Sequence, residues 1–325
     1  MTMHVTPTEA LRTTPLLAAP VQARSHIRDI ADAPLPRAYI VGAAGSGKTA
    51  LLRHLRDLLS SRGMVFHVLD DRLDPASVPR SEVLIVDGLQ LLDEARIEAV
   101  LLRAKNPDAA IVVATRPWPR SSAGSAIARR LGADSPSIVL GPATRAEVVD
   151  LLEAQGRALS PACIDAILTL TGGLGWLVAR AIDAHDTARC TDPLGHADLW
   201  RSVEAHVSHR LDLIDDARLA QFLEVLALVR DGHAGPEGEQ VSDLIAQGHA
   251  EGLLLRNGTM VPVVRSAIRE ALPPPQRLAD LGADAVDEIA AAVAAGDEPS
   301  RAWVLAAGDP RLGASLAEHG DHLID

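Results

Sequence analysis

The stretch "RAYIVGAAGSGKT", residues 37–49, decides the fold of this chain. Its first part, 37–41, has the apolar character of a buried strand, and residues 42–49 fit the phosphate-loop pattern G-x-x-x-x-G-K-[ST]. Five leucines in the segment that follows share one helical face: Leu51, Leu52, Leu55, Leu58 and Leu59. This spacing predicts an amphipathic helix directly after the loop. Strand, glycine-rich loop and helix therefore stand in the order that gives the motif its meaning.

The loop itself carries the chemistry of phosphate binding. Its glycines let the backbone curl so that successive N–H groups point inward, and these groups and the helix N-terminus bind phosphate oxygens. Lys48 places a cation on the outer phosphates, and the Thr49 hydroxyl can join the coordination of Mg²⁺. We expect ATP or ADP with Mg²⁺ to bind through Gly42, Ala44, Gly45, Ser46, Gly47, Lys48 and Thr49.

Strands and helices alternate around this loop. Apolar runs at 65–69, 83–87, 110–115 and 137–140 predict further strands, and "DEARIEAVLLRAK" predicts a helix between two of them. Alternation of this kind is typical of an α/β domain with a parallel sheet, here a P-loop NTPase sheet flanked by helices. We place this domain at residues 21–141, after a flexible N-terminal arm at residues 1–20.

The stretch "LIVDGLQ" ends a predicted strand with Asp87, which can hold Mg²⁺ through water. Many ATP-hydrolysing proteins have a second acid at the next position, where it acts as general base, but Gly88 stands here. Asp93 and Glu94 follow nearby and are alternative bases, although the first turn of a helix favours acids through its dipole. Arg116 follows the strand "IVVAT" and is predicted to contact the γ-phosphate as a sensor.

Composition limits the remaining classes of function. The chain has 325 residues, 43 acidic and 31 basic side chains and a net charge of −12, so we expect poor non-specific nucleic-acid binding. Its two cysteines, Cys163 and Cys190, lie in no metal-binding or redox motif. No secretory signal and no apolar run long enough to span a membrane are evident, so we expect a cytoplasmic protein without membrane contact.

The pattern changes to helices alone in the second half of the chain. We predict a small helical domain at 142–192 and a winged-helix domain at 193–272, in which Asn257-Gly258 marks a hairpin. The last predicted region, 276–325, is α-helical and similar to the start of a TPR-like solenoid.

The order of these motifs resembles the STAND class of signalling ATPases, and within it the MalT-like and large LuxR-type bacterial transcription regulators. The segments that carry the resemblance are "VLIVDG", "IVVATRP", "LGPATRAEVVDLL" and "LTGGLGWLVARAI", in addition to the phosphate loop. The resemblance implies a nucleotide-binding module that ADP holds closed and monomeric, and that an inducer and ATP open for self-assembly. It also implies that DNA is bound by a domain outside this chain.

The resemblance further assigns roles to single residues. It implies that Pro142 packs on the adenine and that Arg24 belongs to an N-terminal motif on the adenine side. Three features depart from the family pattern. The first is Gly88 in place of the second acid, and the second is Val261-Pro262 where a His-Pro pair is common. The third is a short connection between the phosphate loop and Asp87, which leaves little room for one sheet-flanking helix.

Three functional hypotheses follow. The first is a nucleotide-gated regulatory module of a signal-responsive transcription regulator, with slow or absent hydrolysis and an unidentified inducer. The second is an active AAA+-like ATPase that uses a substitute base such as Glu94. The third is a non-enzymatic scaffold with a vestigial nucleotide site.

Overall fold

The computed structural model describes residues 21–133, 137–185, 197–228 and 239–271. The predicted N-terminal arm and the predicted region at 276–325 lie outside these residues. By their contacts, the described residues form two compact units, one running to residue 168 and including 173–183, the other comprising 169–172 and residues from 184 onward. The predicted domain boundaries remain predictions, and each unit is described by itself.

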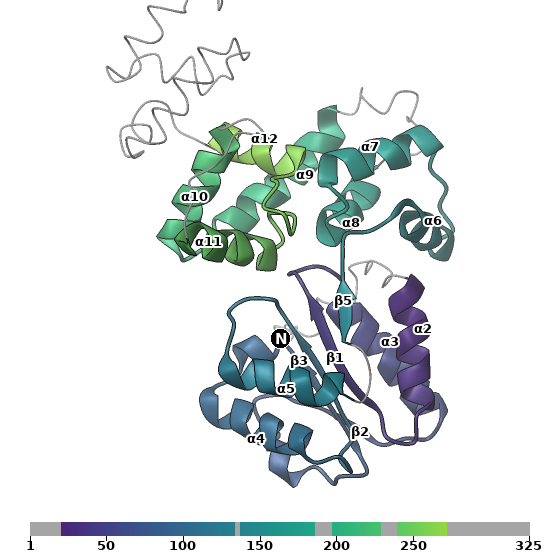
Figure 1. The fold of residues 1–325 in the computed structure, drawn as a ribbon. Coiled ribbons are helices and arrows are strands. Elements are labelled where there is room, and N and C mark those ends of the chain that lie inside the picture. Colours follow the sequence, from purple (N-terminus) through teal and green to yellow (C-terminus); the bar gives the residue numbers. More distant parts are fainter. Residues whose placement is uncertain (1–20, 134–136, 186–196, 229–238, 272–325) are drawn as a thin grey trace, which may run out of the picture. The chain divides into compact units, whose positions relative to one another are not determined.

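The first unit is built on a five-stranded parallel sheet (Figure 1). Its strands lie in the order β2-β3-β4-β1-β5. They are β1 (Arg37–Gly42), β2 (Phe66–Val68), β3 (Val83–Asp87), β4 (Ile111–Thr115) and β5 (Ile138–Leu140). Every pairing is parallel, so the predicted α/β architecture is confirmed.

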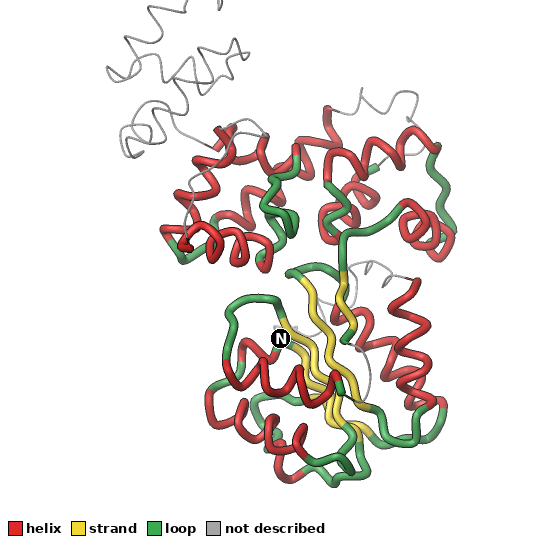
Figure 2. Tube along the Cα trace, in the orientation of Figure 1, coloured by secondary structure: helices red, strands yellow, loops and turns green. Residues whose placement is uncertain are grey.

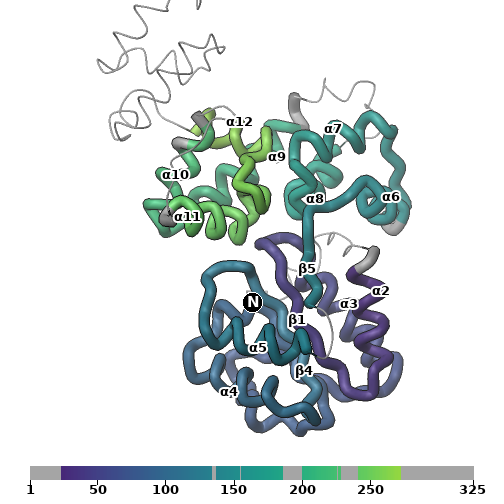
Figure 3. Tube along the Cα trace, viewed as in Figure 1, coloured from purple at the N-terminus to yellow at the C-terminus, as the bar shows by residue number. Residues whose placement is uncertain are grey.

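Helices cover both faces of this sheet (Figures 1 and 2). The pair α2 (Val21–Asp32) and α3 (Lys48–Ser61) covers one face, and α4 (Glu94–Lys105) and α5 (Ser122–Gly132) cover the other. The N-terminal α2 packs on α3 and on the edge strand β5 (Figure 3). The result is a three-layer α/β/α domain.

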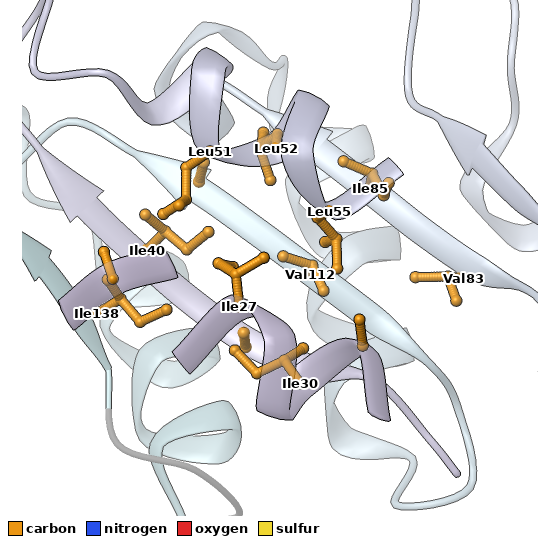
Figure 4. Packing of buried hydrophobic residues seen from close by; sticks show 14 of the residues in the cluster. Ile27, Ile30, Ile40, Leu51, Leu52, Leu55, Val83, Ile85, Val112 and Ile138 are labelled. Atoms are coloured by element: carbon orange, nitrogen blue, oxygen red, sulfur yellow. The ribbon is translucent and has the colours of Figure 1, made fainter. Parts of the chain in front are cut away.

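The alternation of side chains along the strands divides the core in two. In β1, Ala38 and Ile40 join the cluster under α2 and α3, whereas Tyr39 and Val41 face α4 and α5. Figure 4 shows the first cluster, in which Ile27 of α2 and Leu55 of α3 meet the sheet. Both of these side chains are fully buried. The leucine face predicted for 51–59 is therefore the face on which α3 docks.

The connection from β2 to β3 contains a single 3-10 helix, Pro75–Ser77, and no α-helix. The short spacing between the phosphate loop and Asp87 indicated this. Buried Arg103 of α4 fastens the connection, because its guanidinium donates to the carbonyls of Val78, Pro79 and Glu82 at 2.6–2.9 Å. Burial lowers the pKa of Arg103, and the Glu82 carboxylate opposes this shift. The Arg103 side chain thus holds three carbonyl groups of this connection, which has no α-helix of its own.

Three helices follow the sheet: α6 (Arg145–Ala154), α7 (Pro161–Thr171) and α8 (Gly175–Ala184). A capping box begins α6, since Glu147 accepts from the Thr144 N–H and Thr144 Oγ1 accepts from the Glu147 N–H. Ser160 likewise caps α7 by accepting from the Cys163 N–H at 3.1 Å.

The second unit contains four further helices, α9 (Ala197–Leu211), α10 (Ala217–Leu228), α11 (Glu239–Ala250) and α12 (Pro262–Ala271). Between α11 and α12 a single antiparallel bridge joins Leu254 to Met260. Gly258 closes the turn with a φ of 86°. The turn at Asn257-Gly258 is thus present, while the winged-helix assignment remains a prediction. None of the helices described here is long and apolar enough to cross a membrane.

Candidate functional site

The phosphate loop leaves the sheet at the end of β1 and leads directly into α3. Gly45 and Gly47 have φ values of 73° and 95°, a left-handed backbone that favours glycine. Gly47 is the N-cap of α3, so the free N–H groups of the first helical turn face the loop. The sequence motif therefore folds as a glycine-rich loop that ends at a helix N-terminus, an arrangement in which anions can be bound.

Lys48 is held inside the loop. Its Nζ donates to the carbonyl oxygens of Gly42 and Ala43, each at 2.7 Å, and the residue is 8% exposed. These bonds fix the cation next to the loop N–H groups. The predicted role of Lys48 in phosphate binding stays a prediction.

The two residues predicted to hold Mg²⁺ lie together. Thr49 Oγ1 donates to Asp87 Oδ2 at 2.8 Å, which joins the start of α3 to the end of β3. The described residues contain no cluster of three His, Cys, Asp or Glu side chains that could hold a metal ion alone. A hydroxyl and a carboxylate at this distance fit Mg²⁺, which takes few protein ligands and fills its octahedron with water and phosphate oxygens.

Ser46 supports the same fit. Its Oγ is buried and has no hydrogen-bond partner among the described residues. An unpaired hydroxyl in a buried position is unfavourable. A phosphate oxygen held in the loop would provide the missing partner.

Gly88 has a conformational reason to be glycine. Its φ is 88° and its ψ 55°, and it caps the 3-10 helix Leu89–Leu91. A Cβ built at this position would lie 3.1 Å from Leu91 Cδ1. The left-handed backbone of the turn after Asp87 therefore disfavours a second acid at this position, whereas the contact with the exposed Leu91 side chain can be relieved by its rotation.

The alternative bases lie at the start of α4. Asp93 is the N-cap of α4 and accepts from the Arg96 N–H at 2.8 Å, and Glu94 is exposed in the first turn. The capping role suffices to account for Asp93.

Gln90 is a site residue that the sequence analysis missed. Its Oε1 accepts from Thr115 Oγ1 and from the Arg116 N–H, both at 3.1 Å. It thereby links the turn after β3 to the end of β4, where half-buried Arg116 stands as the predicted sensor. Its place two residues after "LIVDG" was the available signal, but its role is visible only because β3 and β4 are neighbours in the sheet.

The two predicted adenine-side residues come from separate elements. Pro142 lies against Gly173, where an added Cβ would be 3.1 Å from Pro142 Cβ, and the Ala143 N–H donates to the Gly173 carbonyl at 2.6 Å. Arg24 lies on α2 near His54 of α3, and burial together with the charge of Arg24 lowers the pKa of His54. No described hydrogen bond joins Arg24 to the phosphate loop, so its assignment remains a prediction.

Trp176 of α8 is a second residue that the sequence analysis missed. A Cβ built on Gly45 would lie 2.5 Å from Trp176 Cβ. Glycine is therefore required at position 45 both for its backbone angle and for this close approach.

Comparisons with known proteins reach only the level of general fold. No family model matches the chain, and no curated protein sequence matches it. Among solved structures, it is similar to a Walker-type ATPase of Pyrococcus abyssi, with 14% identity, TM-score 0.48, and coverage of 77% of this chain and 95% of that one.

Two further structures are similar at the same level. The RuvB Holliday junction branch migration motor of Thermotoga maritima shares 18% identity with TM-score 0.44, covering 81% of this chain and 93% of that one. A STAND protein with a tetratricopeptide repeat sensor from Pyrococcus horikoshii shares 15% identity with TM-score 0.37, covering 94% of this chain and 51% of that one. At these values the likeness does not extend to ligands or partners, and the MalT-like assignment remains a prediction.

We predict that Gly88→Ala lowers the free energy of unfolding by about 1–2 kcal/mol, because an L-residue is strained in the left-handed region. Urea unfolding followed by circular dichroism measures this change. The matched control is Gly132→Ala at the end of α5, where alanine favours helix and no loss is expected. Equal stability of Gly88→Ala and the unsubstituted chain would contradict the steric explanation.

Proposed function

We propose that this chain is a nucleotide-gated regulatory module that binds ATP or ADP with Mg²⁺ and hydrolyses ATP slowly or not at all. The observation that carries the proposal is the contact between Thr49 and Asp87 at 2.8 Å, beside a lysine fixed inside a phosphate loop. The Thr49 hydroxyl, the Asp87 carboxylate and the Lys48 cation are the kinds of group that a magnesium nucleotide requires.

Each group of the site has a distinct part in holding the ligand. The loop N–H groups and Lys48 would bind the phosphates, and the Ser46 hydroxyl would pair with a phosphate oxygen. Thr49 and Asp87 would hold Mg²⁺, which neutralises phosphate charge when bound. Pro142 and Arg24 complete the proposed adenine side.

Slow hydrolysis follows from the groups near Asp87. Gly88 supplies no base, Asp93 caps α4, and Gln90 is the polar side chain that reaches toward the sensor strand. A carboxamide can orient a water molecule but does not accept its proton at neutral pH. We therefore favour a switch over an AAA+-like motor.

The output of the switch belongs to the same proposal. In line with the resemblance to MalT-like and LuxR-type regulators, we propose an ADP-bound closed state and self-assembly with ATP, in response to an unidentified inducer in the cytoplasm. We place the DNA-binding function in a domain outside this chain, because its net charge of −12 disfavours contact with a phosphate backbone. The predicted winged helix would then have a regulatory role.

We expect Lys48→Ala to weaken Mg-ATP binding about 10- to 100-fold, because the substitution removes a charge-assisted contact with the phosphates. Isothermal titration calorimetry measures the affinity. The chain offers a matched control in its other lysine, Lys105, which is exposed at the end of α4. Lys105→Ala should bind like the unsubstituted chain.

The outcome also tests the hypothesis of a vestigial site. Tight binding of ATP or ADP raises the free energy of unfolding by RT ln(1 + c/Kd), where c is the free nucleotide concentration, so it also raises the unfolding temperature. If neither nucleotide binds or shifts the unfolding temperature, the proposal is wrong and a scaffold with a vestigial site is favoured.

Removing Mg²⁺ with EDTA should weaken ATP binding, and Asp87→Asn should abolish most of this dependence, because the carboxylate that supports the metal is lost. Titrations with and without MgCl₂ give the ratio of affinities for each variant. Asp93→Asn, which alters the cap of α4 instead, should keep the dependence on Mg²⁺. A full Mg²⁺ dependence in Asp87→Asn would contradict the assignment of Asp87.

ATP turnover should stay well below about 1 s⁻¹, the low end of the range for ordinary enzymes. A coupled phosphate-release assay measures this rate, and Glu94→Gln should leave it unchanged. Brisk turnover that Glu94→Gln abolishes would instead support an AAA+-like ATPase with Glu94 as substitute base.

A further inference from the structure

A cavity of about 340 Å³ lies on the α4 and α5 side of the sheet. Tyr39 and Val41 of β1, the end of β4, and the first turns of α5 contribute to its wall. No residue of the phosphate loop, 42–49, lines it. Its volume is at the lower end of the range for small-molecule sites. The cavity is thus a separate pocket within the same domain.

The charged residues of this pocket are all basic. Arg116 and Arg120, both from the connection between β4 and α5, line it, and no acidic residue is among the described residues that do so. The N-terminus of α5 also opens there, with Ser121 as N-cap and Ser125 in the first turn. In a chain with a net charge of −12, such a lining selects an anionic group.

Tyr39 provides an independent indication of a ligand. The residue lines the cavity and is only 7% exposed, yet its hydroxyl forms no hydrogen bond to any described residue. Burial raises the pKa of this phenol, so it keeps its proton at neutral pH and remains a donor. The hydroxyl is not among the enclosed polar atoms without a partner, so it is open to the cavity, where a ligand or water can accept from it.

The rest of the wall is apolar. Val41, Leu89, Ile97 and Ala128 contribute aliphatic surface, and Pro117 and Pro119 contribute two rings. The pocket therefore has one part with cations and hydrogen-bonding groups and another part that is apolar. This combination fits a compact apolar body that carries one acidic group.

We propose that this cavity binds a small organic acid as an effector, with its carboxylate toward Arg116, Arg120 and the Tyr39 hydroxyl and its apolar body against Val41, Leu89 and Ile97. The proposed binding of the acid depends only on the cavity. The proposed regulatory effect of the acid also depends on the proposed nucleotide switch.

The coupling between the two sites has a structural basis. Gln90 and Thr115 line the cavity, and the Gln90 side chain holds both Thr115 Oγ1 and the Arg116 backbone. An acid that draws on Arg116 from the cavity side therefore acts on the residue proposed to sense the γ-phosphate. Effector and nucleotide should alter each other's affinity by the same factor.

A suitable probe is 2-naphthoate, with 2-naphthalenemethanol as its uncharged counterpart. Calorimetric titration of the full chain should show naphthoate binding and at least tenfold weaker binding of the alcohol. Tyr39→Phe, which removes only the hydroxyl, should weaken naphthoate binding several-fold to about tenfold. Ala128→Leu should abolish binding by filling the cavity, with circular dichroism to verify its fold.

The control is Arg129→Gln, an exposed cation of α5 outside the cavity, which should bind like the unsubstituted chain, while Arg120→Gln should bind more weakly. Equal binding of acid and alcohol, or unchanged binding in both Tyr39→Phe and Ala128→Leu, would overturn the proposed site.

Two further titrations separate this proposal from the nucleotide switch. Lys48→Ala should still bind naphthoate, because the phosphate loop does not line the cavity. Saturating naphthoate should change Mg-ATP affinity at least twofold, and an unchanged affinity would overturn the coupling. If ATP does not bind at all while naphthoate does, the switch fails and the pocket stands.

Discussion

The parallel pairing of β1 with β4 and of β4 with β3 is the constraint on which the site depends. Val41 lies opposite Thr115, and Asp87 opposite Ala114, so the carboxyl ends of these strands meet at one edge of the sheet. The phosphate loop, Asp87 and Arg116 are distant in sequence and converge there because of this register. The hydrogen bond from Thr49 to Asp87 then joins the first turn of α3 to the end of β3.

Local sequence predicted the parts of the site that a local pattern determines. The phosphate-loop motif specifies backbone N–H groups, lysine and threonine within eight residues, and the apolar run before Asp87 specifies a buried strand. Local periodicity also indicates which strands are buried and which face of a helix packs on the sheet. The parallel α/β sheet and the order of strand, phosphate loop and helix were therefore predictable from the sequence.

Features that depend on contacts between distant segments were not predictable. Gln90 becomes a link only because β3 and β4 are neighbours, and the approach of Trp176 to Gly45 depends on how α8 packs. Gly88 illustrates a second limit. In the sequence, Gly88 indicates only that an acid is missing. In the structure, its positive φ shows that the turn after Asp87 has a backbone conformation that favours glycine.

The position of Lys48 has a consequence for selectivity. Because its ammonium already has two carbonyl partners inside the loop, an incoming anion must compete with the protein's own backbone for this cation. A ligand with a single phosphate offers little to offset the exchange, whereas a polyphosphate adds contacts with the loop N–H groups and with the metal. In the proposed nucleotide site, this competition would disfavour small anions that carry a single phosphate.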